Sequence, residues 1–153
     1  MEPLSERRIR EALEVVDAGA FGAHMRYLER TGSTNDVLRE MADQGAPEGA
    51  IVVADEQTAG RGRMGRVWAA PPRSSLLLSA LFRPALPPEH VYRLVMVCGL
   101  AAAEACEEEE GIGRVDVKWP NDLQISGKKL AGVLAESAFS GGQPEWEPDV
   151  CRP

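Results

Sequence analysis

Apolar and polar residues follow two kinds of repeat along this chain, and the repeats predict both helices and strands. Apolar residues three and four positions apart predict helices at residues 5–17, 33–45 and 90–109. Short apolar runs bounded by turn-forming residues predict strands at residues 25–29, 50–55, 75–82, 114–119, 123–125 and 130–137. A turn at residues 126–128 joins the last two strands into a predicted hairpin. The pattern therefore indicates an α+β protein.

The predicted helices differ in how much of their surface should be covered. Ser5 can cap the first helix, and Ser33 or Thr34 can cap the second. An apolar stripe on one side of the second helix consists of Val37, Leu38, Met41 and Ala42. The third helix is apolar at nearly every position from 91 to 105, so we expect it to be mostly buried.

Composition narrows the class of protein. The 153 residues, 44% hydrophobic and 27% charged, suit one globular domain. A net charge of −7 argues against general nucleic-acid binding. Residues 1–8 lack the apolar core that a signal peptide has, and no apolar run of the sequence reaches membrane-spanning length, so we expect neither a signal peptide nor a membrane span. Cys98 and Cys106 are separated by about 12 Å on one helix, too far for a disulfide, so we expect a reducing cytoplasm as the location.

One short segment of this acidic chain is rich in arginine and glycine. Residues 60–68, which we call the glycine–arginine loop, read Gly-Arg-Gly-Arg-Met-Gly-Arg-Val-Trp. Glycines let the backbone approach a ligand closely, guanidinium groups match phosphate and carboxylate oxygens, and Trp68 can stack on a planar ring. These residues alone leave two interpretations open: an anion-binding loop with an aromatic wall, or a flexible, solvated surface loop.

Three further motifs lie on either side of this loop. Ser33-Thr34-Asn35 precedes it, and Lys118-Trp119-Pro120-Asn121-Asp122-Leu123 and then Gly127-Lys128-Lys129-Leu130-Ala131-Gly132-Val133 follow it. Together the four motifs resemble the catalytic domain of the biotin protein ligases, in that family's order and at about its spacing. The resemblance covers residues 28–136 of the chain.

The resemblance implies a fold and a reaction. The fold is the α+β biotin/lipoate ligase fold, similar to the class II aminoacyl-tRNA synthetases, with a mixed, largely antiparallel sheet covered by helices. The substrates are biotin and ATP, with Mg²⁺ accompanying the nucleotide and no metal cluster of the protein's own. The biotin carboxylate attacks the α-phosphate of ATP, giving biotinyl-5′-AMP and pyrophosphate. A lysine of a carboxylase's biotin carboxyl carrier domain then attacks the mixed anhydride.

The resemblance also implies a role for each matching residue. Lys129 provides a fixed cation near the carboxylate and the transferring phosphate, and Asp122 receives the proton of the acceptor lysine. The full set of implied catalytic residues is Lys129, Arg63, Asp122 and Lys118. The implied biotin-binding residues are Ser33, Thr34, Asn35, Gln57, Gly60, Arg61, Gly62, Arg63 and Lys129. The implied ATP-binding residues are Arg61, Arg63, Arg66, Trp68, Lys118 and Asn121, with Asn121 also a candidate to hold Mg²⁺ through water or phosphate.

Several of these residues also have ordinary structural explanations. Ser-Thr-Asn is a common helix-capping string, and a helix start can cap and bind at once. Asn-Asp after Pro120 is a common turn. Trp68 can also serve only to anchor the loop.

The chain departs from the family pattern after Glu136, where the family makes a further strand with a glycine-rich turn. We expect a catalytic domain at residues 1–137 that lacks the family's C-terminal part, an unstructured tail at residues 138–153, and no winged-helix DNA-binding domain. The expected partner is a carrier domain, not a membrane or a nucleic acid, and a homodimer is one assembly that the sequence allows. Two alternatives stay open: a lipoate or octanoate ligase, and a biotin-binding remnant without catalysis. A nucleic-acid-binding module is disfavoured by the acidic charge.

Overall fold

The computed structural model describes residues 4–16 and 18–137. Their contacts divide into two compact units, each with its own three-stranded sheet. The first unit consists of residues 1–61 and 65–84, and the second of residues 62–64 and 85–153. The division passes through the glycine–arginine loop, because residues 62–64 are assigned to the second unit. The expected tail at residues 138–153 lies outside the described residues.

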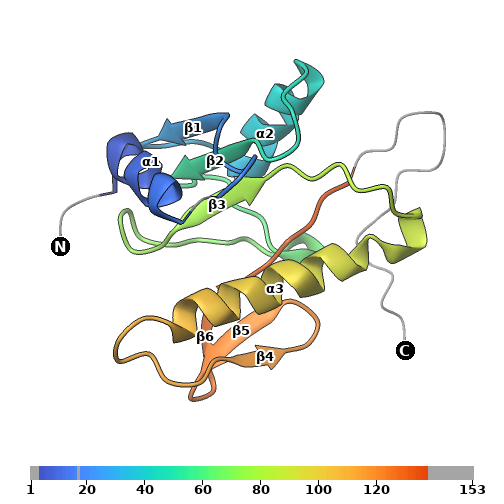
Figure 1. Cartoon of the computed structure of the whole chain (residues 1–153). Helices are drawn as coiled ribbons and strands as arrows, with labels where there is room; N and C mark the ends of the chain where they lie inside the picture. The colour runs from blue at the N-terminus through green and yellow to red at the C-terminus, as the bar shows by residue number, and fades with distance from the viewer. Residues whose placement is uncertain (1–3, 17, 138–153) are drawn as a thin grey trace. The chain divides into compact units, whose positions relative to one another are not determined.

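The sheet of the first unit is mixed. It contains β1 (Met25–Leu28), β2 (Ile51–Ala54) and β3 (Leu77–Ala80), with β2 in the centre. Strand β1 runs parallel to β2, with Met25 opposite Ile51, whereas β3 runs antiparallel, with Ala80 opposite Ile51 (Figure 1). The sheet therefore combines both kinds of pairing in three strands.

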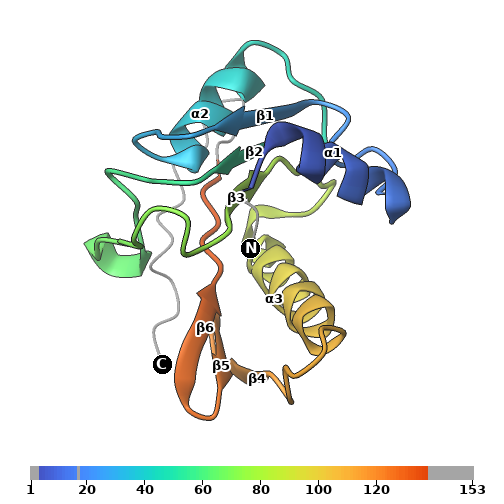
Figure 2. The same cartoon turned by 90° about the vertical axis from the view of Figure 1, so that its left-hand side faces the viewer.

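Both faces of this sheet are covered, and the side chains of β2 alternate between the two covers. Ile51 and Val53 pack toward α1 (Glu6–Val15), where they meet Ile9 and Leu13. Val52 and Ala50 pack on the opposite side toward α2 (Thr34–Asp43), against Leu38, Val37 and Met41. Figure 2 shows the two helices on either side of the strands. Every residue of β2 is buried for this reason, as is typical of a strand that is covered on both faces.

The second unit packs one long helix on an antiparallel sheet. A short 3₁₀ turn (Pro88–His90) leads into α3 (Tyr92–Glu107). The sheet follows in chain order as β4 (Asp116–Lys118), β5 (Asp122–Ile125) and β6 (Lys128–Gly132). A small core joins the two layers, formed by Ala103, Val115 and Leu123 with Cys106, Ile125 and Ala131 around them.

The β5–β6 hairpin contains a β-bulge that changes which way its lysines face. Leu123 is opposite Ala131, but the next pair is Gln124 with Lys129, so Leu130 is the extra residue. Residues directly opposite in an antiparallel pair share a face, and positions two apart on a strand share a face. Lys129 therefore lies on the face of Gln124 and Asp122. Without the bulge it would oppose Ile125, on the face that packs on α3.

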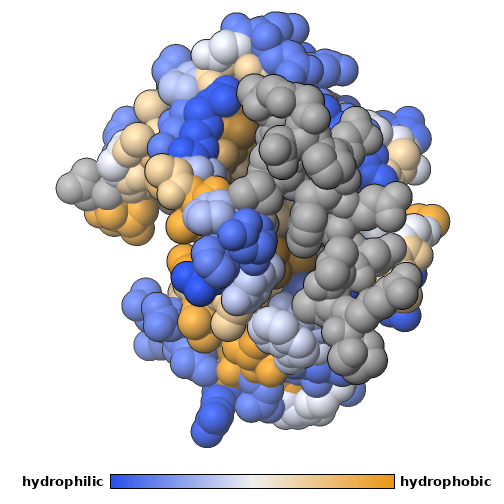
Figure 3. Space-filling view, turned by 90° about the vertical axis from the view of Figure 1, so that its right-hand side faces the viewer, coloured by the Kyte–Doolittle hydropathy of each residue, from blue (hydrophilic) through white to orange (hydrophobic). Residues whose placement is uncertain are grey.

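The expectation that α3 would be mostly buried is wrong. Gly99 and Ala103 are its buried residues, whereas Val97 is 60% exposed and Leu100 53% exposed. Within its own unit, α3 packs on the β4–β6 sheet along one side only, so an all-round apolar pattern leaves apolar side chains at the surface. A groove of about 880 Å³ follows α3 and β4 and is lined in part by Leu100, Ala103, Val115 and Val117. Orange areas in the space-filling view show apolar residues remaining on the face drawn (Figure 3).

Most predicted elements are found, with shifted ends. The α+β class and the largely antiparallel strand pairing are confirmed, although the strands form two sheets. The last strand begins at Lys128 and ends at Gly132, where the pattern predicted residues 130–137. Cys98 and Cys106 are free, half-buried thiols, as predicted, and burial raises the pKa of Cys98. Among the described residues, no helix has both the length and the apolar content needed to cross a membrane.

Candidate functional site

The first turn of α2 is capped by a side chain from a distant segment. Ser33 is the N-cap residue, with extended backbone (φ −153°, ψ 136°), but its hydroxyl makes no capping hydrogen bond. Instead Gln57, from the segment after β2, accepts through Oε1 both from the backbone N–H of Thr34 at 2.7 Å and from its hydroxyl at 2.9 Å. Ser33 and Thr34 are both buried. Three predicted biotin-binding residues therefore lie together at the start of α2.

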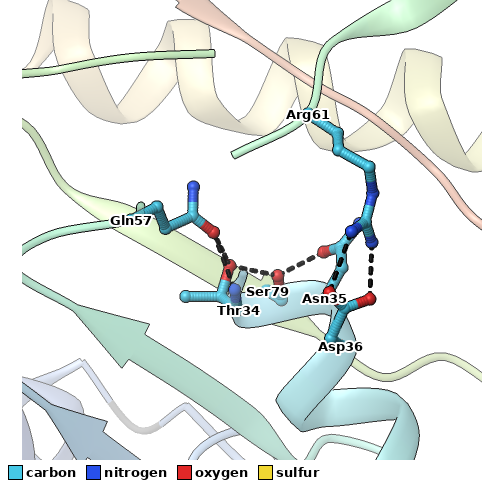
Figure 4. Close-up of polar contacts among 6 residues, drawn as sticks. All are labelled: Thr34, Asn35, Asp36, Gln57, Arg61 and Ser79. Atoms are coloured by element: carbon cyan, nitrogen blue, oxygen red, sulfur yellow. Dashed lines mark hydrogen bonds and ion pairs between the residues drawn. The ribbon is translucent and has the colours of Figure 1, made fainter. Parts of the chain in front are cut away.

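A serine of β3 extends this arrangement into a chain of polar side chains. Ser79 Oγ lies 2.8 Å from Thr34 Oγ1 and also contacts the side-chain amide of Asn35. We call Gln57, Thr34, Ser79 and Asn35 the polar chain (Figure 4). Sequence reasoning missed Ser79. The available signal was a single hydroxyl within the apolar run Leu76-Leu77-Leu78-Ser79-Ala80-Leu81, because a polar residue on the buried side of a strand needs a partner.

Arg61 forms a bidentate ion pair with Asp36 beside the polar chain. Its Nη1 and Nη2 donate to Asp36 Oδ2 and Oδ1 at 2.8 and 2.7 Å. Asp36 lies in the first turn of α2, where a negative charge is favourable for the helix. The hydrogen bond from Arg61 holds the pKa of Asp36 below its usual value. The ion pair fastens the first arm of the glycine–arginine loop to α2, and Asp36 was not among the predicted site residues.

Replacing Asp36 with asparagine should lower the free energy of unfolding by less than about 1 kcal/mol, because both partners are partly exposed. Since the pKa of Asp36 is depressed in the folded protein, this stabilisation is present above the usual value of 3.8 and is lost as the pH falls through the lower folded value. Urea unfolding should therefore separate the variant from the wild-type chain at neutral pH and bring them together in acid. The control, Asp43→Asn, removes the same charge from the exposed far end of α2 and should not reproduce this pH dependence. Equal urea midpoints at neutral pH for the wild-type chain and Asp36→Asn would contradict the expectation.

The two arms of the glycine–arginine loop pair with each other. Trp68 N donates to Gly60 O at 2.9 Å, and Arg61 and Val67 form an isolated antiparallel bridge. Between the arms, Arg63–Gly65 form a 3₁₀ turn in which Met64 has φ 57°. Trp68 is half-buried and Arg66 is exposed. The loop thus forms a hairpin-like turn whose two arms are paired.

Arg63 is positioned by the turn that precedes β5. Its Nη1 donates to Asn121 Oδ1 at 3.2 Å. Asn121 Nδ2 in turn donates to Val133 O at 3.1 Å, and Val133 N donates to Asn121 O at 2.9 Å. These bonds fix the orientation of the Asn121 amide, so its oxygen faces the guanidinium. The structure therefore brings together two predicted ATP-binding residues that are 58 positions apart.

Lys129 and Asp122, both predicted to be catalytic, form an ion pair. Lys129 Nζ lies 2.7 Å from Asp122 Oδ1, and the lysine side chain passes over Gly132. Lys118 is directly opposite Asp122 in the β4–β5 ladder and is exposed. One carboxylate therefore lies between two lysines of neighbouring strands. Within the described residues, no cluster of three or more His, Cys, Asp or Glu side chains is arranged to hold a metal ion.

The candidate residues thus fall into two groups, one in each unit. The first unit combines neutral hydrogen-bonding groups with a guanidinium, which suits an uncharged polar ring and a nearby anion. The second unit holds Arg63, Lys129 and Lys118 beside carboxylate and amide oxygens, which suits phosphate chemistry and proton transfer. The residues of each group come from segments far apart in the sequence.

A family model for the biotin/lipoate A/B protein ligase family matches residues 27–144 of the chain. Among curated proteins, the chain is 41% identical over 133 residues to the bifunctional ligase/repressor BirA of Bacillus subtilis, which covers 87% of this chain and 40% of that protein. It is 39% identical over 140 residues to the biotin--[acetyl-CoA-carboxylase] ligase of Mycobacterium tuberculosis, covering 89% of this chain and 52% of that protein. The chain therefore spans about half the length, or less, of these relatives.

Solved structures agree with the sequence comparison. The biotin protein ligase of Leishmania major in complex with biotinyl-5-AMP is similar with a TM-score of 0.64 and 34% identity, over 76% of this chain and 53% of that one. The ligase of Aquifex aeolicus in complex with biotin and ATP has a TM-score of 0.63 and 36% identity, over 76% and 47% of the two chains. Sequence motifs, fold and family model coincide over most of the chain, which belongs to the biotin/lipoate A/B protein ligase family.

Proposed function

We propose that this chain carries the function of an ATP-dependent biotin protein ligase. The observation that supports this most is the polar chain beside Arg61, because biotin combines an uncharged polar ureido ring with a carboxylate. The named relatives and structural neighbours are biotin ligases, and one of the neighbours is a complex with biotin and ATP. The proposed products are biotinyl-5′-AMP and then a biotinylated lysine on a biotin carboxyl carrier domain.

In the proposed first step, the biotin carboxylate attacks the α-phosphate of ATP and pyrophosphate leaves. Ser33, Thr34, Asn35 and Gln57 would hold the ureido ring, and the loop residues Gly60, Arg61, Gly62 and Arg63 would receive the anionic end. Lys129 would stabilise the negative charge that develops on phosphorus, because a fixed cation costs no reorganisation during the reaction. Its ion pair with Asp122 keeps the ammonium positioned when no substrate is bound.

The proposed second step transfers the biotinyl group to a lysine amine. The acceptor amine must lose a proton to attack the anhydride, and Asp122 is the carboxylate proposed to take it. The amine nitrogen forms a bond with the biotin carbonyl carbon, and AMP leaves. Lys118 would contact the phosphate from the strand opposite Asp122. The ion pair between Asp122 and Lys129 must open for this role, so that the Asp122 carboxylate is free to accept the proton.

The proposed nucleotide contacts are Arg66, Trp68 and Asn121, together with Arg61, Arg63 and Lys118. Trp68 would stack on adenine, and Mg²⁺ would enter with the ATP phosphates. Asn121 is the candidate to assist it through water or phosphate, although its side chain is engaged by Arg63 and Val133 here. The free thiols of α3 are consistent with the cytoplasm as the proposed location, and a homodimer remains a hypothesis for the assembly.

Biotin should bind more tightly than lipoate. Lipoate has no ureido ring, so it would leave the buried hydrogen-bonding groups of the polar chain without partners, at about 1–3 kcal/mol for each group. Isothermal titration calorimetry of this chain with both acids measures the difference. Equal or tighter binding of lipoate would favour a lipoate or octanoate ligase instead.

Catalysis is tested separately from binding by the exchange of labelled pyrophosphate into ATP. The first step predicts exchange that depends on biotin and is absent without it. Biotin binding without any exchange would favour a binding remnant over an enzyme. Exchange supported by octanoate but not by biotin would reassign the substrate within the same family.

A further inference from the structure

The polar chain contains three oxygen–oxygen contacts but only two hydroxyl protons that could form hydrogen bonds across them. Thr34 and Ser79 each carry one hydroxyl proton. Thr34 Oγ1 contacts Gln57 Oε1 at 2.9 Å and Ser79 Oγ at 2.8 Å. Ser79 Oγ also contacts the side-chain amide of Asn35. The direction of each hydrogen bond therefore constrains the next one along the chain.

The backbone fixes the direction at one end. The N–H of Thr34 can only donate, so the Gln57 amide must turn its oxygen toward α2. Gln57 Oε1 is an acceptor, so the Thr34 hydroxyl donates its only proton to it at 2.9 Å. Thr34 Oγ1 must then accept a hydrogen bond from Ser79 Oγ. This bond uses the single hydroxyl proton of Ser79, so Ser79 cannot also donate to Asn35. Figure 4 shows the Gln57 nitrogen on the side away from Thr34.

The contact between Ser79 and Asn35 is then a hydrogen bond only if Asn35 donates. A half-turn of the Asn35 amide about its last side-chain torsion brings Nδ2 to Ser79 Oγ and turns Oδ1 away from it. The opposite order, from Thr34 to Ser79 to Asn35 Oδ1, leaves two acceptor oxygens 2.9 Å apart at Gln57 and Thr34 with no proton between them. Only the first order satisfies all of the contacts.

We propose that Ser79 is a positioning residue for ligand selection in this site. By accepting a hydrogen bond from Asn35 Nδ2, Ser79 holds the Asn35 amide with its oxygen turned away from Ser79. Thr34 donates to Gln57 Oε1 and so holds the Gln57 amide with its nitrogen turned away from Thr34. The site then offers a donor and an acceptor of fixed polarity, which matches a ring carbonyl next to a ring N–H. This assignment rests on the proposed function, because biotin supplies that ring, and it adds a residue in β3 that acts on selectivity through Asn35.

The proton order is tested first in the protein without any ligand. NMR of the wild-type chain should show that Asn35 side-chain amide protons exchange at least about tenfold more slowly than those of Gln57, since one of them is bonded to a buried hydroxyl oxygen. In Ser79→Ala the Asn35 protons should become as fast as those of Gln57. Equal exchange rates for the two amides in the wild-type chain would overturn the proposal, whether or not any variant folds.

Ligand selection is tested with biotin and its cyclic carbamate analogue, in which a ring N–H is replaced by a ring oxygen. Ser79→Ala should reduce the preference for biotin over the analogue by about tenfold, because a freed Asn35 amide can turn its N–H toward the ring oxygen. Ser79→Thr keeps a hydroxyl and should keep the preference, and Ser75→Ala, whose hydroxyl lies 3.5 Å from that of Ser74, should leave it unchanged. An unchanged preference in Ser79→Ala would overturn the assignment of Ser79. If the wild-type chain binds neither acid, the proposed function fails, while the amide exchange rates still decide the proton order.

Discussion

Replacing Lys129 with alanine should slow biotin-dependent pyrophosphate exchange by about a hundredfold or more, since it removes a fixed cation from the proposed site of developing negative charge. The variant also leaves Asp122 without the ammonium that lies 2.7 Å from it, so an uncompensated carboxylate would face an anionic substrate. Both effects act in the same direction. Exchange of labelled pyrophosphate into ATP reports the first chemical step alone.

The neighbouring lysine provides a matched control. Lys128→Ala removes the same charge from the same strand, but Lys128 is opposite Ile125 and faces the other side of the hairpin. It should leave the exchange rate nearly unchanged. The double variant Lys129→Ala with Asp122→Asn should recover part of the loss, because it removes the uncompensated charge. An exchange rate in Lys129→Ala equal to that of Lys128→Ala would remove Lys129 from the mechanism.

Replacing Gly60 with alanine should both destabilise the protein and weaken biotin binding. A Cβ atom at this position would lie 2.5 Å from Trp68 O and 3.1 Å from Gln57 Nε2. The carbonyl cannot move away easily, because the Trp68 N to Gly60 O hydrogen bond joins the two arms of the loop. Overpacking of this kind costs about 1–3 kcal/mol. Displacement of the Gln57 amide should also raise the Kd for biotin by more than about tenfold.

Urea unfolding and calorimetry measure the two effects of Gly60→Ala. Gly32→Ala is the control, because a Cβ at Gly32 has no heavy atom within 4 Å and the residue lies in the same unit. Its stability and its affinity for biotin should stay close to those of the wild-type chain. If Gly60→Ala behaved like Gly32→Ala in both measurements, the close packing of Gly60 against Trp68 and Gln57 would matter neither for stability nor for biotin binding.

Local patterns predicted the elements well because they depend on neighbouring residues. The apolar stripe of α2 and the apolar run of β2 were visible in the sequence, and both form the expected cores. The prediction for α3 failed because helical periodicity shows which side chains are apolar, not how many of them find a partner. Its pattern is apolar nearly all round, but Val97 and Leu100 remain at the surface.

The partners within the candidate site could not be predicted in the same way. The motifs identified Arg61, Arg63 and Lys129, but not that Asp36 would hold Arg61 across 25 positions. Such a pair depends on how β2 and α2 fold back on each other. Ser79 was hidden for a different reason: a serine in an apolar strand looks the same whether it faces solvent or a buried amide. Motifs indicate candidate binding groups, whereas their supporting contacts depend on the three-dimensional arrangement.

The bulge at Leu130 has a consequence for anyone who shortens, lengthens or grafts this hairpin. Extra residues in the turn at Ser126-Gly127 leave the count between Lys129 and Ala131 unchanged, so the lysine keeps its side. Deleting Leu130 would make Lys129 and Ala131 neighbours on a regular strand, and neighbouring residues face opposite sides, so the lysine would keep its side without a bulge. A change that straightens the strand but keeps Leu130 would instead put Lys129 and Ala131 on the same face and turn the lysine toward the core. The opposite facing of Lys129 and Ala131, more than the identity of Leu130, is therefore the property that an engineered or natural variant of the hairpin has to preserve.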